Sequence, residues 1–122
     1  MVHVNNTVYF RWFETLRVRQ FSQDIYPEFS FTPVGKKPVI SETWCRFRRS
    51  VELYDSVVIG CRVLDVDQPR GEFKQEYAVW SERQSTVAAV GGCTIVVCDF
   101  DLDGGPRTPI PDDWLPKLMA LH

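Results

Sequence analysis

The strongest constraint on the fold is a change in the spacing of apolar residues close to residue 38. Before that point apolar residues recur every three to five positions, which is the spacing of one face of a helix. After it, apolar and polar residues alternate with a period of two, which is typical of half-buried strands. A helix with one apolar stripe needs a flat apolar surface to cover it. The two patterns therefore predict an α+β fold in which an antiparallel sheet wraps one long helix.

We expect the helix over residues 7–22. Asn5 or Asn6 can cap it, because an Asn side chain at this position accepts hydrogen bonds from backbone amides of the first turn. The apolar stripe consists of Val8, Tyr9, Trp12, Phe13, Leu16 and Phe21. The opposite face is expected to carry the charged residues Arg11, Glu14, Arg17 and Arg19. Residues 27–38, which include three prolines and a glycine, are expected to form a loop.

Four strands are predicted after this loop, over residues 39–49, 56–66, 72–82 and 86–99. The short polar joints between the later segments favour an antiparallel meander. In the second segment one face holds most of the apolar residues, whereas the last segment is apolar or small on both faces. The last strand should therefore be central and covered on both sides. A final helical turn is expected near residues 112–118.

Composition indicates a single domain over residues 1–122, because the chain is 44% hydrophobic and 13% aromatic. With 14 Lys and Arg against 16 Asp and Glu, the chain has no general attraction for a polyanion, so we expect no nucleic-acid partner. The longest stretch without those residue types, 84–98, contains polar residues and glycines unsuited to a bilayer, so we expect no membrane span.

The cysteines Cys45, Cys61, Cys93 and Cys98 lack the spacing of a zinc or redox motif, so we expect free thiols and no metal site. No basic and then apolar leader opens the sequence, which favours the cytoplasm. An organellar location stays open if upstream residues are missing.

The first residues resemble the start of the hotdog-fold acyl-CoA thioesterases of the 4-hydroxybenzoyl-CoA thioesterase type. The matching string is His3-Val4-Asn5-Asn6-Thr7-Val8-Tyr9, with an aromatic-Glu pair, Phe13-Glu14, further along. Weaker similarity to later family segments extends over residues 45–57, 73–77, 87–91 and 109–114, in order. The resemblance implies a hotdog fold, a homodimer, and hydrolysis of an acyl-CoA thioester to a free acid and coenzyme A.

The sequence departs from the family at its beginning. Most members carry a first strand and then a catalytic Asp a few residues before the histidine, whereas only Met1 and Val2 precede His3 here. Two explanations compete. An N-terminally truncated form of a longer protein would lack both features, and so would a shortened relative that has lost the hydrolytic group. We favour truncation, because the motif is interrupted in its middle at a Met.

The catalytic candidates are His3, Asn5 and Asn6. Backbone amides at a helix N-terminus can polarise a thioester carbonyl, and His3 has a side chain that can act as a base near neutral pH. The alternatives are that His3 only fixes the loop and that the Asn residues only cap the helix. Glu14 lies about 12–13 Å along the helix from Asn6, too far to act on the same carbonyl within one subunit.

Tyr9, Arg46, Arg48 and Arg49 are the substrate-binding candidates. Tyr9 could line an acyl pocket, although an aromatic at helical spacing is more often core. The arginines suit the phosphates of coenzyme A, although solvated strand ends carry such residues too. No cofactor is expected apart from the coenzyme A of the substrate. A hotdog dimer that binds a thioester or a protein partner without turnover is the main alternative function, and a dehydratase is a weaker one.

Overall fold

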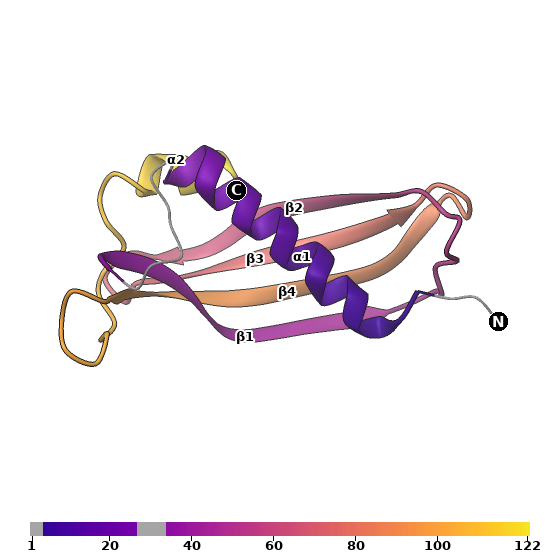
Figure 1. Cartoon of the computed structure of the whole chain (residues 1–122). Coiled ribbons are helices and arrows are strands. Elements are labelled where there is room, and N and C mark those ends of the chain that lie inside the picture. Colours follow the sequence, from indigo (N-terminus) through magenta and orange to yellow (C-terminus); the bar gives the residue numbers. More distant parts are fainter. Residues whose placement is uncertain (1–3, 27–33) are drawn as a thin grey trace.

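One long helix crosses one face of a four-stranded antiparallel sheet (Figure 1). The structure is a computed structural model and describes residues 4–26 and 34–122. The expected α+β arrangement is confirmed. The elements in chain order are α1 (Asn6–Gln20), the π-helical segment η1 (Phe21–Ile25), β1 (Lys36–Phe47), β2 (Val57–Asp67), β3 (Glu72–Ser81), β4 (Thr86–Asp99) and α2 (Leu115–Ala120).

The strand order is β1-β4-β3-β2, so the expected four-strand meander is only partly correct. Strands β2, β3 and β4 follow one another as hairpins, but β1 pairs with β4 on the far side of the sheet. Residues 48–56 therefore cross one end of the sheet to reach β2. Strand β4 takes the central position because both its faces are apolar or small, as the sequence predicted, and this leaves β1 and β2 at the edges.

Two adjacent glycines in β4 let other groups approach both faces of the sheet. A Cβ atom on Gly91 would lie 2.5 Å from Cε2 of Phe13, so the absence of a side chain here lets α1 pack close to the sheet. A Cβ atom on Gly92 would lie 2.8 Å from Nε1 of Trp44, whose indole covers the opposite face. The face under α1 is called the inner face below, and the face with Trp44 the outer face.

The helical run is longer than predicted, because the expected end at residue 22 is followed by η1 up to Ile25. The wider π turn is closed by the amide of Tyr26, which donates to the carbonyl of Phe21. It keeps Phe21 and Ile25 on the buried side, where they are 4% and 1% exposed. Tyr9 and Phe13 are buried as expected, whereas Arg17, which was predicted on the charged face, is half-buried.

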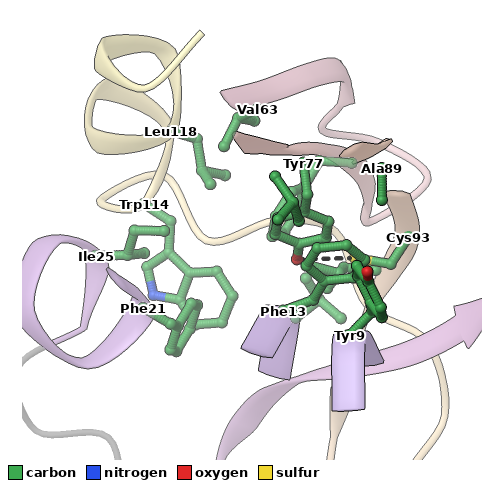
Figure 2. Close-up of a cluster of buried hydrophobic side chains, with 14 of the residues drawn as sticks. Tyr9, Phe13, Phe21, Ile25, Val63, Tyr77, Ala89, Cys93, Trp114 and Leu118 are labelled. Carbon is green, nitrogen blue, oxygen red and sulfur yellow. Dashed lines mark hydrogen bonds between the residues drawn. The ribbon is translucent and has the colours of Figure 1, made fainter. Parts of the chain in front are cut away.

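The C-terminal segment closes the core at the end of α1 that lies opposite the N-terminus (Figure 1). Trp114 packs edge-to-face on Phe21 with ring centroids 5.1 Å apart, and Figure 2 shows Leu118 beside Val63. The amide of Val63 donates to the carbonyl of Leu121, which covers part of the β2 edge. Helix α2 begins at Leu115, later than the expected turn at residue 112, with Pro116 in its first turn.

The strand boundaries differ little from the predicted ones. Strand β1 begins at Lys36, inside the expected loop, and most of the rest of that loop, residues 27–33, lies outside the described residues. On β2 the inner face holds the better buried residues, as predicted. All four cysteines are free thiols; Cys93 is buried and the others are half-buried.

Candidate functional site

Hydrogen bonds at the N-terminus of α1 leave the amide of its first residue, Asn6, without an acceptor among the described residues. The side chain of Asn5 caps the helix: its Oδ1 accepts from the amide and the hydroxyl of Thr7, both at 3.0 Å. The carbonyl of Asn5 accepts from the amide of Val8, also at 3.0 Å. Among the described residues no acceptor is found for the amide of Asn6. The amide of Asn6, in the first turn of the helix, is therefore available to polarise a ligand.

A cavity of about 330 Å³ opens at this end of the helix. The residues around it come from the start of α1, the end of β1 and the loop that follows: Val4, Asn6, Tyr9, Phe47, Arg48, Arg49 and Ser50. The structure thus brings Asn6, Tyr9, Arg48 and Arg49 together, although the sequence separates the two pairs by some forty positions.

Hydrogen bonds to backbone carbonyls hold the wall of this cavity in place. The amides of Arg48 and Arg49 both donate to the carbonyl of Ala88, at 2.9 and 3.0 Å. The side chain of Gln84 donates to the carbonyl of Ser50 at 2.7 Å, and the amide of Val4 donates to the carbonyl of Val51 at 2.8 Å. The loop after β1 is therefore fixed relative to both α1 and β4, while the Arg48 and Arg49 side chains remain exposed.

Tyr9 is both a core residue and a wall of the cavity. It is 2% exposed and packs edge-to-face on Phe47, with ring centroids 4.9 Å apart. Burial, and next the nearby Cys45, raise the pKa of Tyr9 above its usual value. Tyr9 is therefore protonated at neutral pH and can donate a hydrogen bond, but it cannot serve as a base there.

Three predicted site residues, Arg46, His3 and Asn5, are not among the described residues that line the cavity. Arg46 is two residues after Trp44 on β1, so its side chain lies on the same outer face, and it pairs with Val90 of β4. It is therefore separated from Arg48 and Arg49. His3 lies outside the described residues. Asn5 precedes Asn6 in the chain, and its side-chain oxygen is occupied as the helix cap.

No carboxylate lies among the described residues that line this cavity. Glu14 is two turns further along α1 and borders a different cavity, which agrees with the distance expected from the sequence. The described cavity therefore offers a backbone amide and two arginines, but no carboxylate that could act as a nucleophile or activate a water.

Sequence analysis missed the polar cluster under the C-terminal half of α1. Nη1 of Arg17 donates to the hydroxyl of Tyr77 at 3.3 Å, and this hydroxyl donates to Oε1 of Gln75. Nε2 of Gln75 then donates to Oε1 of Gln20 at 2.7 Å. A signal was present, because Arg17 is four residues after Phe13 and eight after Tyr9 and so continues the buried stripe.

Residues 4–26 and 34–122 contain no cluster of three or more His, Cys, Asp or Glu side chains arranged to hold a metal ion. In the same two ranges, neither helix has the length and apolarity that a bilayer span requires.

Comparison with known proteins agrees with the fold and points to a family. A family model described as thioesterase-like superfamily matches residues 1–118. A Thermus thermophilus thioesterase, solved with coenzyme A and Zn, is similar at 28% identity and a TM-score of 0.78, over 98% of this chain and 81% of that one. A predicted thioesterase from Bacillus stearothermophilus has 24% identity and a TM-score of 0.82, over 98% and 83% of the two chains.

The PA5185 protein of Pseudomonas aeruginosa has 20% identity and a TM-score of 0.83, over 99% of this chain and 80% of that one. At these lower identities the similarity concerns the fold alone. No curated protein matches the chain.

Proposed function

Because this chain belongs to the thioesterase-like superfamily and has the hotdog fold, we propose that it hydrolyses an acyl-CoA thioester to a free acid and coenzyme A. The observation that carries the proposal is the amide of Asn6, which has no acceptor among the described residues and lies at the positive end of α1 beside a cavity with two arginines. Such an amide stabilises negative charge that develops on a carbonyl oxygen.

In the proposed reaction the thioester oxygen accepts a hydrogen bond from the Asn6 amide. A water adds to the carbonyl carbon and gives up a proton to a base, and the oxygen becomes an oxyanion stabilised by the same amide. The C–S bond then breaks, and the coenzyme A thiolate takes up a proton as the acid leaves. His3 stays the predicted base from sequence analysis, and Asn5 acts by holding the helix turn that presents Asn6.

Arg48 and Arg49 would bind the phosphates of coenzyme A, since exposed guanidinium groups can move to meet phosphate oxygens. Coenzyme A is bound by the Thermus thermophilus relative, which supports this substrate class. Tyr9 and Phe47 would contact the part of the substrate next to the thioester. Arg46 lies on the other face of the sheet and is not included in this proposal.

The role of the Asn6 amide can be tested with Asn6→Pro, which removes the N–H. Asn6 is the first residue of α1, where proline is favoured, and Asn5 has φ −66° and ψ 142°, which suits a residue before proline. We expect kcat for thiol release from an acyl-CoA panel to fall about 100-fold or more, as when one oxyanion donor is lost. The matched control is Asn6→Ala, which keeps the amide and should stay within a few-fold of the parent chain.

The assay is run on the 122-residue chain and on a form extended upstream. Equal activity of Asn6→Pro and Asn6→Ala in an active form, with equal thermal stability, would show that the amide does not stabilise the transition state. Activity in the extended form alone would support the truncation expected from the sequence.

The lack of a carboxylate among the described cavity residues favours one alternative, a hotdog dimer that binds acyl thioesters without turnover. This function predicts that acyl-CoA binds, with loss of binding in an Arg48→Gln, Arg49→Gln double variant, while neither form of the chain releases thiol.

The proposal includes a homodimer. Strand β1 is an edge strand of twelve residues, and in the described parts of the chain no strand pairs with its free side. Exposed edges of this length are commonly covered by a second subunit. The cytoplasmic location stays a prediction, which fractionation of expressing cells would check.

A further inference from the structure

A second cavity, of about 240 Å³, lies beside the C-terminal half of α1, between the helix and the inner faces of β1, β3 and β4. Most of its wall is apolar, with Phe73 and Ile95 forming the floor, both of them buried. Three lining residues are polar or charged: Glu14, Arg17 and Gln75. The exposed Glu14 and the 37% exposed Ile40 mark the opening to solvent.

Arg17 brings a positive charge to this apolar cavity. In the described parts of the chain its guanidinium contacts the Tyr77 hydroxyl at 3.3 Å and Sγ of Cys93 at 4.0 Å, and no carboxylate lies within ion-pair distance. The exposed arginines Arg62, Arg83 and Arg107, in contrast, each pair with a glutamate. Several exposed arginines also lack a described partner, but Arg17 is the half-buried one, and burial makes an unpaired charge more costly.

The hydrogen bonds around Arg17 orient its guanidinium. The Tyr77 hydroxyl accepts from Arg17 because its own proton goes to Gln75, which in turn donates to Gln20. Tyr77 and Gln75 are 1% and 3% exposed, so this chain of hydrogen bonds is held in the core. A guanidinium has several N–H donors in one plane, and only Nη1 is used here. The remaining donors can bind a planar, bidentate anion, and a carboxylate has that shape.

We propose that this cavity binds a small carboxylic acid, with its carboxylate on Arg17 and its apolar body against Phe73 and Ile95. The volume of about 240 Å³ exceeds the roughly 150 Å³ that holds benzene in an engineered apolar cavity. Acids such as phenylacetate or octanoate are therefore of suitable size.

This site is separate from the helix N-terminus within one chain. Arg17 is eleven residues beyond Asn6, which corresponds to about 16 Å along the helix axis. The proposal therefore concerns binding of a free acid and does not depend on hydrolysis at the other cavity. Glu14, at the opening, carries the same charge as the ligand and lowers its affinity.

The test is isothermal titration calorimetry with octanoate and its neutral isostere octanamide, repeated with phenylacetate and phenylacetamide. We expect each carboxylate to bind the parent chain at least about 10-fold more tightly than its amide, since charge-assisted hydrogen bonds to arginine are strong. Arg17→Met keeps the apolar stem and should abolish this preference. Glu14→Gln removes the repelling charge and should tighten octanoate binding about two- to five-fold.

Two control variants and one blocking variant complete the test. Arg11→Met removes an exposed charge from the same helix and should leave binding unchanged. Asn6→Pro should also leave it unchanged, which separates this site from the proposed thioester site. Ile40→Trp fills the opening from an exposed position, so it should abolish binding even if Arg17→Met fails to fold. Equal affinity for acid and amide, a preference for octanoate over octanamide that survives Arg17→Met, or binding that survives Ile40→Trp would each overturn the proposal.

Discussion

At the scale of single residues, the proposed function assigns Arg48 and Arg49 to substrate binding and not to the chemical step. Their amides are fixed on Ala88, but their side chains are exposed at the cavity, so they can meet the phosphates of coenzyme A. We expect the double variant Arg48→Gln, Arg49→Gln to raise KM for acyl-CoA about tenfold with kcat little changed, and added salt to raise KM of the parent chain.

The matched control is Arg46→Gln, which removes a charge from the outer face of the same strand. Steady-state kinetics of thiol release give KM and kcat for all three proteins. An equal rise in KM for Arg46→Gln would mean that overall charge, and not the position of the two arginines, attracts the substrate.

Asp55 makes the stability of the β3–β4 turn depend on pH. Its carboxylate accepts from the hydroxyl of Ser81 and from the amide of Arg83, the latter at 3.0 Å, and the Ser81 hydrogen bond holds its pKa below the usual 3.8. A lowered folded-state pKa means that Asp55 contributes stability above pH 3.8, and that this contribution is lost as the pH falls below that value.

We therefore expect Asp55→Asn to lower the urea midpoint at neutral pH and to flatten its decrease between about pH 5 and pH 2. The comparison is Asp103→Asn, an exposed position in the loop after β4, which should keep the acid dependence of the parent chain. If both variants lose stability with falling pH as the parent does, the hydrogen bond between Asp55 and Ser81 does not control the acid dependence of stability.

At the scale of elements, the contact between α1 and β4 depends on a missing side chain. The added Cβ of Gly91→Ala would lie 2.5 Å from Phe13 and 2.9 Å from the carbonyl oxygen of Trp44, so either the helix or β1 has to move. We expect a loss of about 1–3 kcal/mol of unfolding free energy, typical of overpacking.

Gly60→Ala on β2 is the control, because its Cβ would meet nothing within 4 Å. Alanine in a strand restricts the unfolded chain, so this variant should be neutral or slightly more stable. Urea unfolding at one protein concentration compares the two. Equal changes in unfolding free energy would mean that replacing any strand glycine has this effect, and that the contact with the helix does not determine it.

The same elements show what sequence patterns predict well and what they miss. Alternation located the four strands and the central β4, because each residue's face follows from its position alone. Alternation could not show that β1 pairs with β4. In both edge strands one face is more buried than the other, so the pattern does not tell them apart, and the pairing depends on the path of residues 48–56. The cavity at Asn6 depends on that path, since it brings Arg48 and Arg49 to the helix. Of this site, only the capping of α1 could be predicted from the local sequence. That the Asn6 amide lacks a described acceptor became clear only from the hydrogen bonds that Asn5 makes in the structure.

At the scale of the whole molecule, the free side of β1 determines the proposed assembly. If two chains pair along β1, the amides of β1 that point away from β4 become hydrogen-bonded and exchange slowly with solvent. We expect hydrogen exchange to show this protection at high protein concentration and to lose it on dilution, while amides of the central β4 stay protected throughout. Sedimentation equilibrium should give twice the mass of one chain at the high concentration. A single-chain mass with fast exchange along β1 would rule out this dimer.

The distribution of the tryptophans gives the molecule its own optical reporters. Trp114 is 3% exposed and lies against Phe21, whereas Trp44 and Trp80, on the outer face, are 43% and 40% exposed. A water-soluble quencher such as iodide should therefore distinguish an accessible, red-shifted fraction from the outer face and a protected, blue-shifted fraction from Trp114, with the half-buried Trp12 of α1 between them. Changes in the first fraction would report events on the sheet surface, and loss of the second would report release of the C-terminal segment, without any added label.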